Sequence, residues 1–336
     1  MNTAPPYPPS WLDRFAAWVE RQPGPPWIIY AALGAAGYLA TSVLRWLDGR
    51  QPVGAFDPLP PPFLLWALGV LALHHYLDRY ARRALEQFRP LIQSDQAQYD
   101  RLEYELTITP ARAALVGGAL WVVVSAIIVV TTRRLAFSYF PVWEVVISVL
   151  TFFMGGAFIQ HVLHQMRTVR RIYARVDHVD LYDTQPLMAF SGLTVRAAIG
   201  LVLLQYAILA ILPGESKLTL VIPSVALTLI AVAVFVWPLL GVHHLLEEEK
   251  GEQMAAVEQR LKAAVAMLYQ RIDSGELAGM DDVEKTITSL KTTRDLVGSR
   301  PTWPWQPATV RGLATAILLP IGLWLLQELL QRLLRL

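Results

Sequence analysis

Long apolar stretches separated by short polar segments are the main pattern of this chain. Each stretch is close to the roughly 20 residues that a helix needs to cross a hydrocarbon core about 30 Å thick. They lie at residues 27–46, 62–77, 113–131, 142–163, 193–212, 218–242 and 313–330. We therefore expect an all-α membrane protein with seven transmembrane helices.

The distribution of basic residues predicts how these helices are oriented. The second stretch is the weakest, because His74 and His75 interrupt it, but counting it as a span leaves 22 of the 29 Lys and Arg on the side of the N-terminus. Without the long segment 250–311 the bias is still 13 against 7. Basic residues in short loops favour the cytoplasm. We expect a multi-pass protein of the cell membrane with the N-terminus in the cytoplasm and the C-terminus outside.

The polar segments divide the chain into four parts. In the first part, Ser10 followed by Asp13 is typical of a capped helix that lies at the membrane interface. The cytoplasmic extensions of the second part lie at about 80–110 and 165–190. The parts are an N-terminal segment at 1–26, a six-helix transmembrane region at 27–244, a cytoplasmic helical hairpin at 245–300, and an aromatic elbow with the seventh span at 301–336.

The hairpin carries an apolar stripe. Gly275 and Gly279 predict its turn. The stripe can pack on the return helix, on the extensions of neighbouring spans, or on the hairpin of another subunit. Candidates for an oligomer anchor are the stripe residues and two tryptophans of the elbow: Met254, Val257, Leu261, Val265, Leu268, Trp303 and Trp305.

Composition narrows the possible partners. Of the 336 residues 54% are hydrophobic and 17% are charged, and the net charge is +2. Membrane lipid is therefore the expected surrounding, and nucleic acid is not an expected partner. The sequence has no cysteine, which excludes disulfides, thiolate metal sites and a catalytic cysteine. We expect no cofactor.

Histidines provide the candidate metal ligands. All seven lie on or near the side expected to be cytoplasmic. His161 and His164 are three residues apart and share a helix face, and His74, His244 or Asp78 could complete a metal shell. The alternative is that histidines at helix ends interact with lipid headgroups and bind no metal.

The seventh span has an apolar inner part and a polar outer end. In a symmetric oligomer, one face of this helix would form an apolar constriction below a polar mouth, as in channels with hydrophobic gates. The alternative is an ordinary helix that ends in water. The candidate pore-lining residues are Leu313, Ala316, Pro320, Leu323, Gln327, Gln331 and Arg335.

This layout resembles the seven-helix ion-channel superfamily of insect olfactory and gustatory receptors. The shared features are a cytoplasmic N-terminus, prolonged helices four to six, a cytoplasmic helix before the last span, and a C-terminus just beyond it. The resemblance implies a homotetramer joined by its cytoplasmic part, with the last helix lining a cation pore. The gustatory motif in that helix, Thr-Tyr, five apolar residues and Gln-Phe, is replaced here, because Thr315 precedes Ala316 and Gln327 precedes Glu328. Ligand class and gating therefore do not carry over.

Three functions follow from these patterns. The expected function is a homo-oligomeric ion channel or channel-like receptor without enzymatic activity. A metal-dependent membrane enzyme that uses the inner-leaflet histidines is the first alternative. The chain also resembles the zinc hydrolases that include alkaline ceramidases and adiponectin receptors, but their His-x-x-x-His pair is missing from residues 311–336. The second alternative is a non-conducting scaffold or sensor whose cytoplasmic helices recruit a partner.

Overall fold

A computed structural model describes residues 5–58, 61–92, 95–131, 142–176, 180–211, 217–275, 279–305 and 307–334. This part of the chain is helical, as expected, and contains no strand beyond an isolated bridge between Pro9 and Pro110. The helices in chain order are α1 (Trp11–Arg21), α2 (Pro26–Leu47), α3 (Pro62–Phe88), η1 (Arg89–Leu91), α4 (Gln96–Thr107), α5 (Ala111–Thr131), α6 (Val142–Tyr173), η3 (Pro186–Met188), α7 (Ala189–Ile211), α8 (Lys217–Val236), η4 (Trp237–Leu239), α9 (Leu240–Ser274), α10 (Met280–Gly298) and α11 (Pro307–Leu334).

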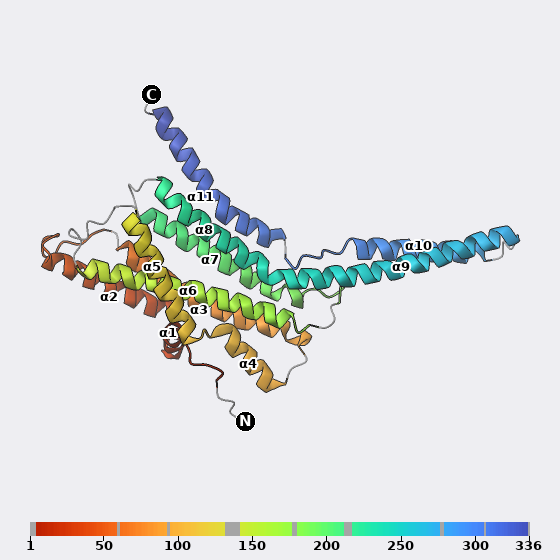
Figure 1. Cartoon of the computed structure of the whole chain (residues 1–336), viewed down its shortest axis with the longest axis horizontal. Helices are drawn as coiled ribbons and strands as arrows, with labels where there is room; N and C mark the ends of the chain where they lie inside the picture. Colours follow the sequence, from red (N-terminus) through yellow and green to blue (C-terminus); the bar gives the residue numbers. More distant parts are fainter. Residues whose placement is uncertain are drawn as a thin grey trace.

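Helix α3 lies at the centre of the helical body. It packs against α6 and α7 along its length, and against α1, α2 and α4 on its remaining sides (Figure 1). Its fully buried residues include Val70, Leu77 and Leu85, which belong to a core shared with α6, α7 and α8. Side chains of α3 are therefore placed to meet residues that are far apart in the sequence.

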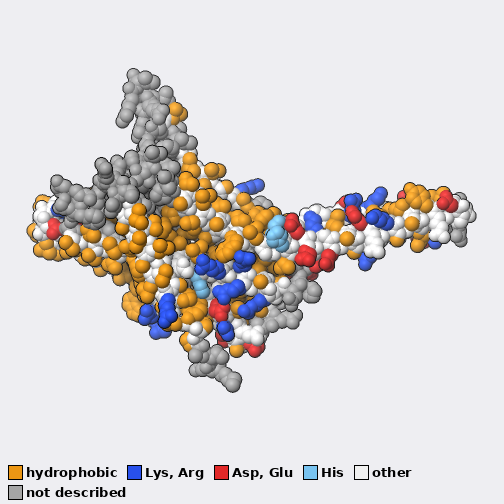
Figure 2. All heavy atoms as spheres, viewed as in Figure 1, with side chains coloured by type: hydrophobic (Ala, Val, Ile, Leu, Met, Phe, Trp, Pro, Cys, Tyr) orange, Lys and Arg blue, Asp and Glu red, His pale blue; other side chains and the backbone are white. Residues whose placement is uncertain are grey.

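The outer surface of the body is strongly apolar. Large hydrophobic side chains such as Leu39, Val116, Leu120 and Leu150 are each more than half exposed. Figure 2 shows hydrophobic side chains over most of the body, with charged ones gathered toward one end and along the projecting hairpin. Such a surface is characteristic of a membrane protein. In the described residues, four helical stretches are long and apolar enough to cross a membrane: Pro26–Leu47, Val142–Tyr173, Pro186–Ala207 and Ser224–Ser274.

The longest of these stretches continues from the body into the hairpin. Only the 3-10 turn η4 interrupts it, at Pro238. A proline lacks the N–H group that an α-helix needs and crowds the preceding turn, which explains the local change of geometry. Beyond η4 the chain runs through the 35 residues of α9 away from the body (Figure 1). We call α9 and α10 the arm.

The arm closes on itself. Gly275 and Gly279 have φ angles of 70° and 78°, so they form the turn in the left-handed conformation that glycine tolerates best. Along the paired helices Val257 and Val283 are buried. Met254 packs against the core of the body, and Leu261, Val265 and Leu268 are half-buried. The return helix thus covers the apolar stripe, which was the first of the three possibilities.

An aromatic stack fixes the root of the arm. The Trp303 ring lies 3.8 Å from the His243 ring and 4.2 Å from the Trp305 ring, with nearly parallel planes. Trp305 stacks in turn on Phe235. Lys250 donates hydrogen bonds to backbone carbonyls at the end of α10. Trp303 and Trp305 therefore contact their own chain, and their role as anchors between subunits stays a prediction.

Helix α11 packs differently from the arrangement expected for a pore. Leu313 is only 6% exposed and Ala316 packs against the core, so this face contacts the protein's own α7. The outward face carries Leu318 and Leu319 instead. The side chains of Pro320, Leu323, Gln327 and Gln331, and all of Arg335, lie outside the described part of the chain.

Close packing of α5 on α6 depends on glycines. A Cβ atom at Gly156 would collide with the carbonyl oxygen of Gly117 and with the Trp121 side chain. A Cβ atom at Gly117 would lie 2.7 Å from the Gln160 Cβ. Small residues let helix backbones approach closely in membrane proteins. This contact helps to hold α6 in place beside α5.

Gly156→Ala should therefore destabilise the protein by about 1–3 kcal/mol, because the added methyl group meets backbone atoms that cannot move aside. Thermal unfolding of the detergent-purified chain measures this. Gly241→Ala is the matched control, since a Cβ atom there meets nothing within 4 Å. Equal unfolding temperatures for the two variants would contradict the proposed packing constraint.

Candidate metal centre

The N-terminal segment is bound to the connection between α4 and α5. The backbone N–H of Ser10 donates to the Thr109 carbonyl, and the N–H of Ala111 donates to the Pro8 carbonyl. The Tyr7 hydroxyl donates to the Ile108 carbonyl at 2.9 Å. These hydrogen bonds bring the start of α1 against residues about 100 positions later in the chain.

Helix α1 begins with the capping box expected from Ser10 and Asp13. The Asp13 N–H donates to the Ser10 hydroxyl, and the Ser10 N–H donates to the Asp13 carboxylate. Leu12 and Val19 are 1% exposed. The Trp11 ring stacks on Phe153 of α6. An apolar face of α1 is thus buried against the body, and this contact places the Asp13 side chain in the interior.

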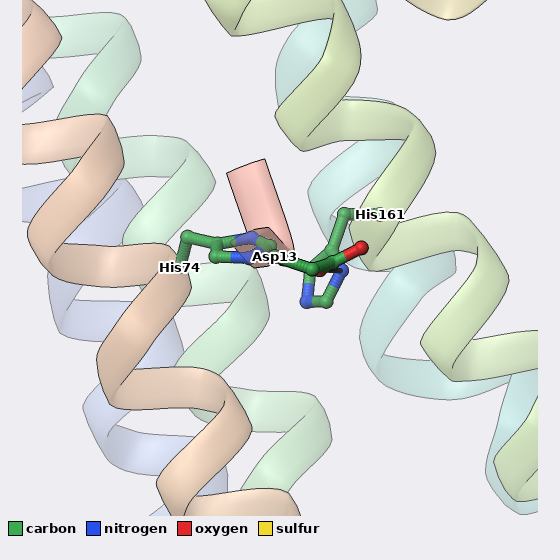
Figure 3. A group of neighbouring side chains, drawn as sticks. All are labelled: Asp13, His74 and His161. Atoms are coloured by element: carbon green, nitrogen blue, oxygen red, sulfur yellow. Dashed lines mark ion pairs between the residues drawn. The ribbon is translucent and has the colours of Figure 1, made fainter. Parts of the chain in front are cut away.

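Asp13 meets two histidines from the body. Figure 3 shows it between His74 of α3 and His161 of α6. Its Oδ1 atom lies 3.1 Å from His74 Nε2 and 4.0 Å from His161 Nδ1. One ligand-type atom from each residue lies within 4.8 Å of the others, a spacing that a single metal ion could bridge.

Asp78 adds a fourth group. It is four residues after His74 on the same face of α3, and its Oδ2 lies 3.4 Å from His74 Nε2. Its Oδ1 lies 3.1 Å from His161 Nε2. We call Asp13, His74, Asp78 and His161 the Asp–His cluster.

Thr109 orients two members of the cluster. Its backbone N–H donates to Asp13 Oδ2 at 3.0 Å, and its hydroxyl lies 2.7 Å from His161 Nδ1. Asp13 Oδ2 also accepts the Ser10 N–H, so that oxygen is satisfied and Oδ1 is left facing the histidines. A partner on Nδ1 leaves His161 Nε2 available as a ligand. Partners of this kind fix the orientation of ligands around protein-bound metals.

The distances within the cluster are compatible with a bound metal ion. Two ligand atoms that are each about 2.1 Å from a tetrahedral Zn²⁺ lie roughly 3.4 Å apart. The separations of 3.1 Å and 3.4 Å within the cluster match this value. The facing atoms are buried and have no hydrogen-bond partner with acceptable angles: Asp13 Oδ1, His74 Nε2, Asp78 Oδ1 and His161 Nε2. Buried polar atoms without partners are rare, and one ion could satisfy those of Asp13, His74 and His161, with Asp78 beside them.

The cluster also has the charge that a divalent cation would balance. Burial opposes ionisation of Asp13, but the imidazoles of His74 and His161 and the capping contact with Ser10 hold the pKa of its carboxyl below the ordinary value. Asp78 follows the expected end of the second span, and burial raises its pKa to about 7. A cation beside Asp78 would favour its ionised form. Two carboxylates and two neutral imidazoles would together neutralise a divalent ion.

Burial of the cluster limits its chemistry. The four side chains belong to residues that are between 1% and 4% exposed. Structural zinc sites have four protein ligands, whereas catalytic sites keep a position open for water or substrate. A closed, four-ligand arrangement can fix helices relative to one another. It offers no path for a substrate.

The other predicted metal ligands lie elsewhere. His164 Nε2 contacts the Tyr7 hydroxyl at 3.1 Å and the Glu105 carbonyl at 3.0 Å, so it holds the N-terminal segment rather than joining the cluster. His244 is at the root of the arm, where its ring lies 5.7 Å from that of His243. His164 and His244 thus lie apart from the cluster, whereas His74, His161 and Asp78 are brought together.

Asp13 is the ligand candidate that sequence reasoning missed. The capping role was a sufficient explanation for an aspartate at this position. Nothing in the local sequence connects it with histidines 61 and 148 positions away. A polar residue within the apolar face of α1, between Leu12 and Ala16, was the available signal. Comparisons with protein-family models, curated proteins and solved structures give no match for this chain.

Proposed function

We propose that this chain is an integral membrane protein in which one divalent metal ion of the zinc type fastens α1 to the membrane helices. The convergence of buried, unpartnered ligand atoms from Asp13, His74 and His161, with Asp78 beside them, carries the proposal. The ligands come from α1, α3 and α6, so the ion would join three elements. The role is structural, which differs from the metal-dependent enzyme considered above.

The membrane arrangement belongs to the same proposal. The four long apolar helices, together with α3, α5 and α11, give seven spans with the N-terminus in the cytoplasm. The excess of basic residues on that side and the apolar surface of the body support this arrangement. The Asp–His cluster would then lie near the cytoplasmic end of the helices, within reach of the cytoplasmic metal pool.

Metal occupancy would control how firmly α1 is held. Metal ligands must be deprotonated and brought together, so binding and local folding are linked. Without the ion, Asp13 would stay buried only by pairing with protonated histidines, since an uncompensated buried carboxylate is strongly unfavourable. The chain would in this way report metal availability through the position of its N-terminal helix.

Substitution of cluster histidines tests for the metal. The purified wild-type chain should retain about one zinc ion after dialysis, and His74→Ala or His161→Ala should lower its affinity by more than about 100-fold, beyond the effect of losing an outer partner. Elemental analysis gives the stoichiometry. A chelator should lower the unfolding temperature of the wild-type chain and leave that of His161→Ala unchanged.

His244→Ala and His164→Ala are the controls, because neither residue belongs to the cluster. Both should keep the metal. A wild-type chain that contains no more bound metal than His161→Ala after incubation with Zn²⁺, Mn²⁺, Fe²⁺ or Cu²⁺ would rule out the proposed centre.

Release of α1 gives a second test. Asp13→Asn keeps the side-chain size but removes the charged ligand, so trypsin should cleave faster at Arg14 and Arg21, which are exposed but protected by the helix. Chelation of the wild-type protein should have the same effect. Ser10→Ala is the comparison: loss of the cap costs about 1 kcal/mol but leaves the ligands, so the metal content should stay the same. Equal metal loss in both variants would contradict a direct role for Asp13.

A homo-oligomeric channel or channel-like receptor is the second candidate, supported by the arm. The arm extends away from the body (Figure 1). Its surface carries exposed hydrophobic side chains (Figure 2). Met267, Tyr269, Ile272 and Leu296 are each at least half exposed. Side chains of this kind would be covered if arms from several copies met in the cytoplasm. A tetramer is the assembly that the resemblance to insect receptors implies.

The oligomeric state in lipid nanodiscs tests this candidate. Mass photometry should show tetramers of the wild-type chain, and Tyr269→Asp/Ile272→Asp should shift them toward monomers, because each buried large side chain contributes about 1.5–3 kcal/mol. Gln270→Asp/Thr286→Asp adds the same charge at polar positions and should leave the tetramer intact. A wild-type protein that is monomeric at all concentrations would exclude the channel assembly.

A further inference from the structure

A cavity of about 350 Å³ lies between the start of α2 and one face of α3. It is separate from the Asp–His cluster, although His75 in its wall follows His74. The six α3 residues in its wall recur at steps of three and one, so they form a single stripe along the helix. Its lining is Pro26, Trp27 and Tyr30 of α2 with Ala72, His75, Tyr76, Arg79, Tyr80 and Arg83 of α3.

Positive charge gathers at one end of this α2–α3 cavity. Arg79 and Arg83 are exposed, and neither forms an ion pair with a carboxylate in the part of the chain that the structure describes. Arg196 of α7 adjoins them: its guanidinium lies 4.1 Å from the centre of the Tyr80 ring and donates to the Tyr76 hydroxyl at 2.9 Å. Two guanidinium groups of the lining, those of Arg79 and Arg83, are thus available at the mouth of the cavity, and a third, that of Arg196, lies beside its tyrosines.

The nearest carboxylate is already engaged. Glu20 of α1 lies 3.5 Å from His75 Nε2 and 3.0 Å from Arg82. The other nitrogen of His75 contacts the Tyr30 hydroxyl at 3.2 Å. Glu20 is therefore paired with His75 and Arg82, and it leaves Arg79 and Arg83 to an external anion.

The opposite end of the cavity is apolar. Ala72 lies two helical turns before Arg79 on α3. Trp27, which is 67% exposed, stands at the start of α2 and near the cationic end of the cavity, because Tyr30 in the next turn of α2 contacts His75. Tryptophan favours the level of the lipid headgroups. The lining thus changes from apolar to cationic along the direction in which a lipid would stand.

We propose that the α2–α3 cavity binds the headgroup of an anionic phospholipid from the cytoplasmic leaflet. The phosphate would lie between Arg79 and Arg83, because a guanidinium group pairs well with a phosphate. The glycerol region would lie beside Tyr30 and Tyr76, and the acyl chains would follow Ala72 and the exposed face of α2. Basic pockets between membrane helices on the cytoplasmic side recognise lipid headgroups in this way.

Lipid titration of the purified full-length chain, followed by native mass spectrometry, tests this. The wild-type protein should bind one phosphatidylglycerol more tightly than phosphatidylcholine. Arg79→Ala/Arg83→Ala should weaken phosphatidylglycerol binding roughly 30-fold, from about 1 kcal/mol for each arginine. Ala72→Phe fills the cavity without changing the charge and should also remove the preference.

Arg167→Ala/Arg175→Ala is the matched control. Both of these residues are exposed arginines of the same cytoplasmic region, on and just after α6, outside the cavity. Equal loss in this control would show that general surface charge attracts the lipid, and full retention in Ala72→Phe would show that the cavity is not used. Displacement of the lipid by an excess of inorganic phosphate would indicate a soluble phosphate site instead; each of these results overturns the proposal. His161→Ala should keep the preference for phosphatidylglycerol, so the lipid proposal and the metal proposal can be tested independently of each other.

Discussion

The need to compensate buried carboxylates governs the end of the helical body against which α1 packs. Asp13 and Asp78 are almost completely removed from solvent, and each faces the imidazoles of His74 and His161. A charged group in such surroundings must be matched by opposite charge and by hydrogen bonds, or it takes up a proton. The fixed backbone contacts of Asp13 Oδ2 and the contact of Thr109 with His161 are consistent with that requirement. The docking of α1, the α4–α5 connection and the pairing of α3 with α6 therefore depend on one another.

The helical body satisfies a different constraint. Between helices surrounded by lipid, packing must come from shape, since hydrocarbon tails are as apolar as the side chains. The glycines of α5 and α6 meet this demand, and so does the aromatic stack from Phe235 to His243 where α9 leaves the body. The same logic explains why Leu313 and Ala316 of α11 face their own subunit: α7 offers a complementary apolar surface along the first half of that helix.

Local patterns predicted the helices well, and they predicted the candidate site only in part. The apolar stretches, the cap at Ser10 and the turn between Gly275 and Gly279 each depend on neighbours in the sequence, so the residues themselves carry the information. The Asp–His cluster depends on tertiary packing. Helical spacing relates His74 to Asp78, but it cannot show that α1 folds back so that Asp13 reaches them. His164 illustrates the opposite error, because sharing a face with His161 did not mean sharing its partners.

The length of α9 beyond the turn at η4 has a mechanical consequence. An α-helix rises about 1.5 Å per residue, so the 35 residues of α9 extend about 50 Å from the proline turn at η4. A rod of that length acts as a lever: a tilt of about 10° at Pro238 displaces its far end by roughly 9 Å. A displacement of an ångström or two among the membrane helices would therefore become several times larger at the tip near Gly275. Conversely, a movement imposed on the tip would reach the body as a smaller displacement with a larger force.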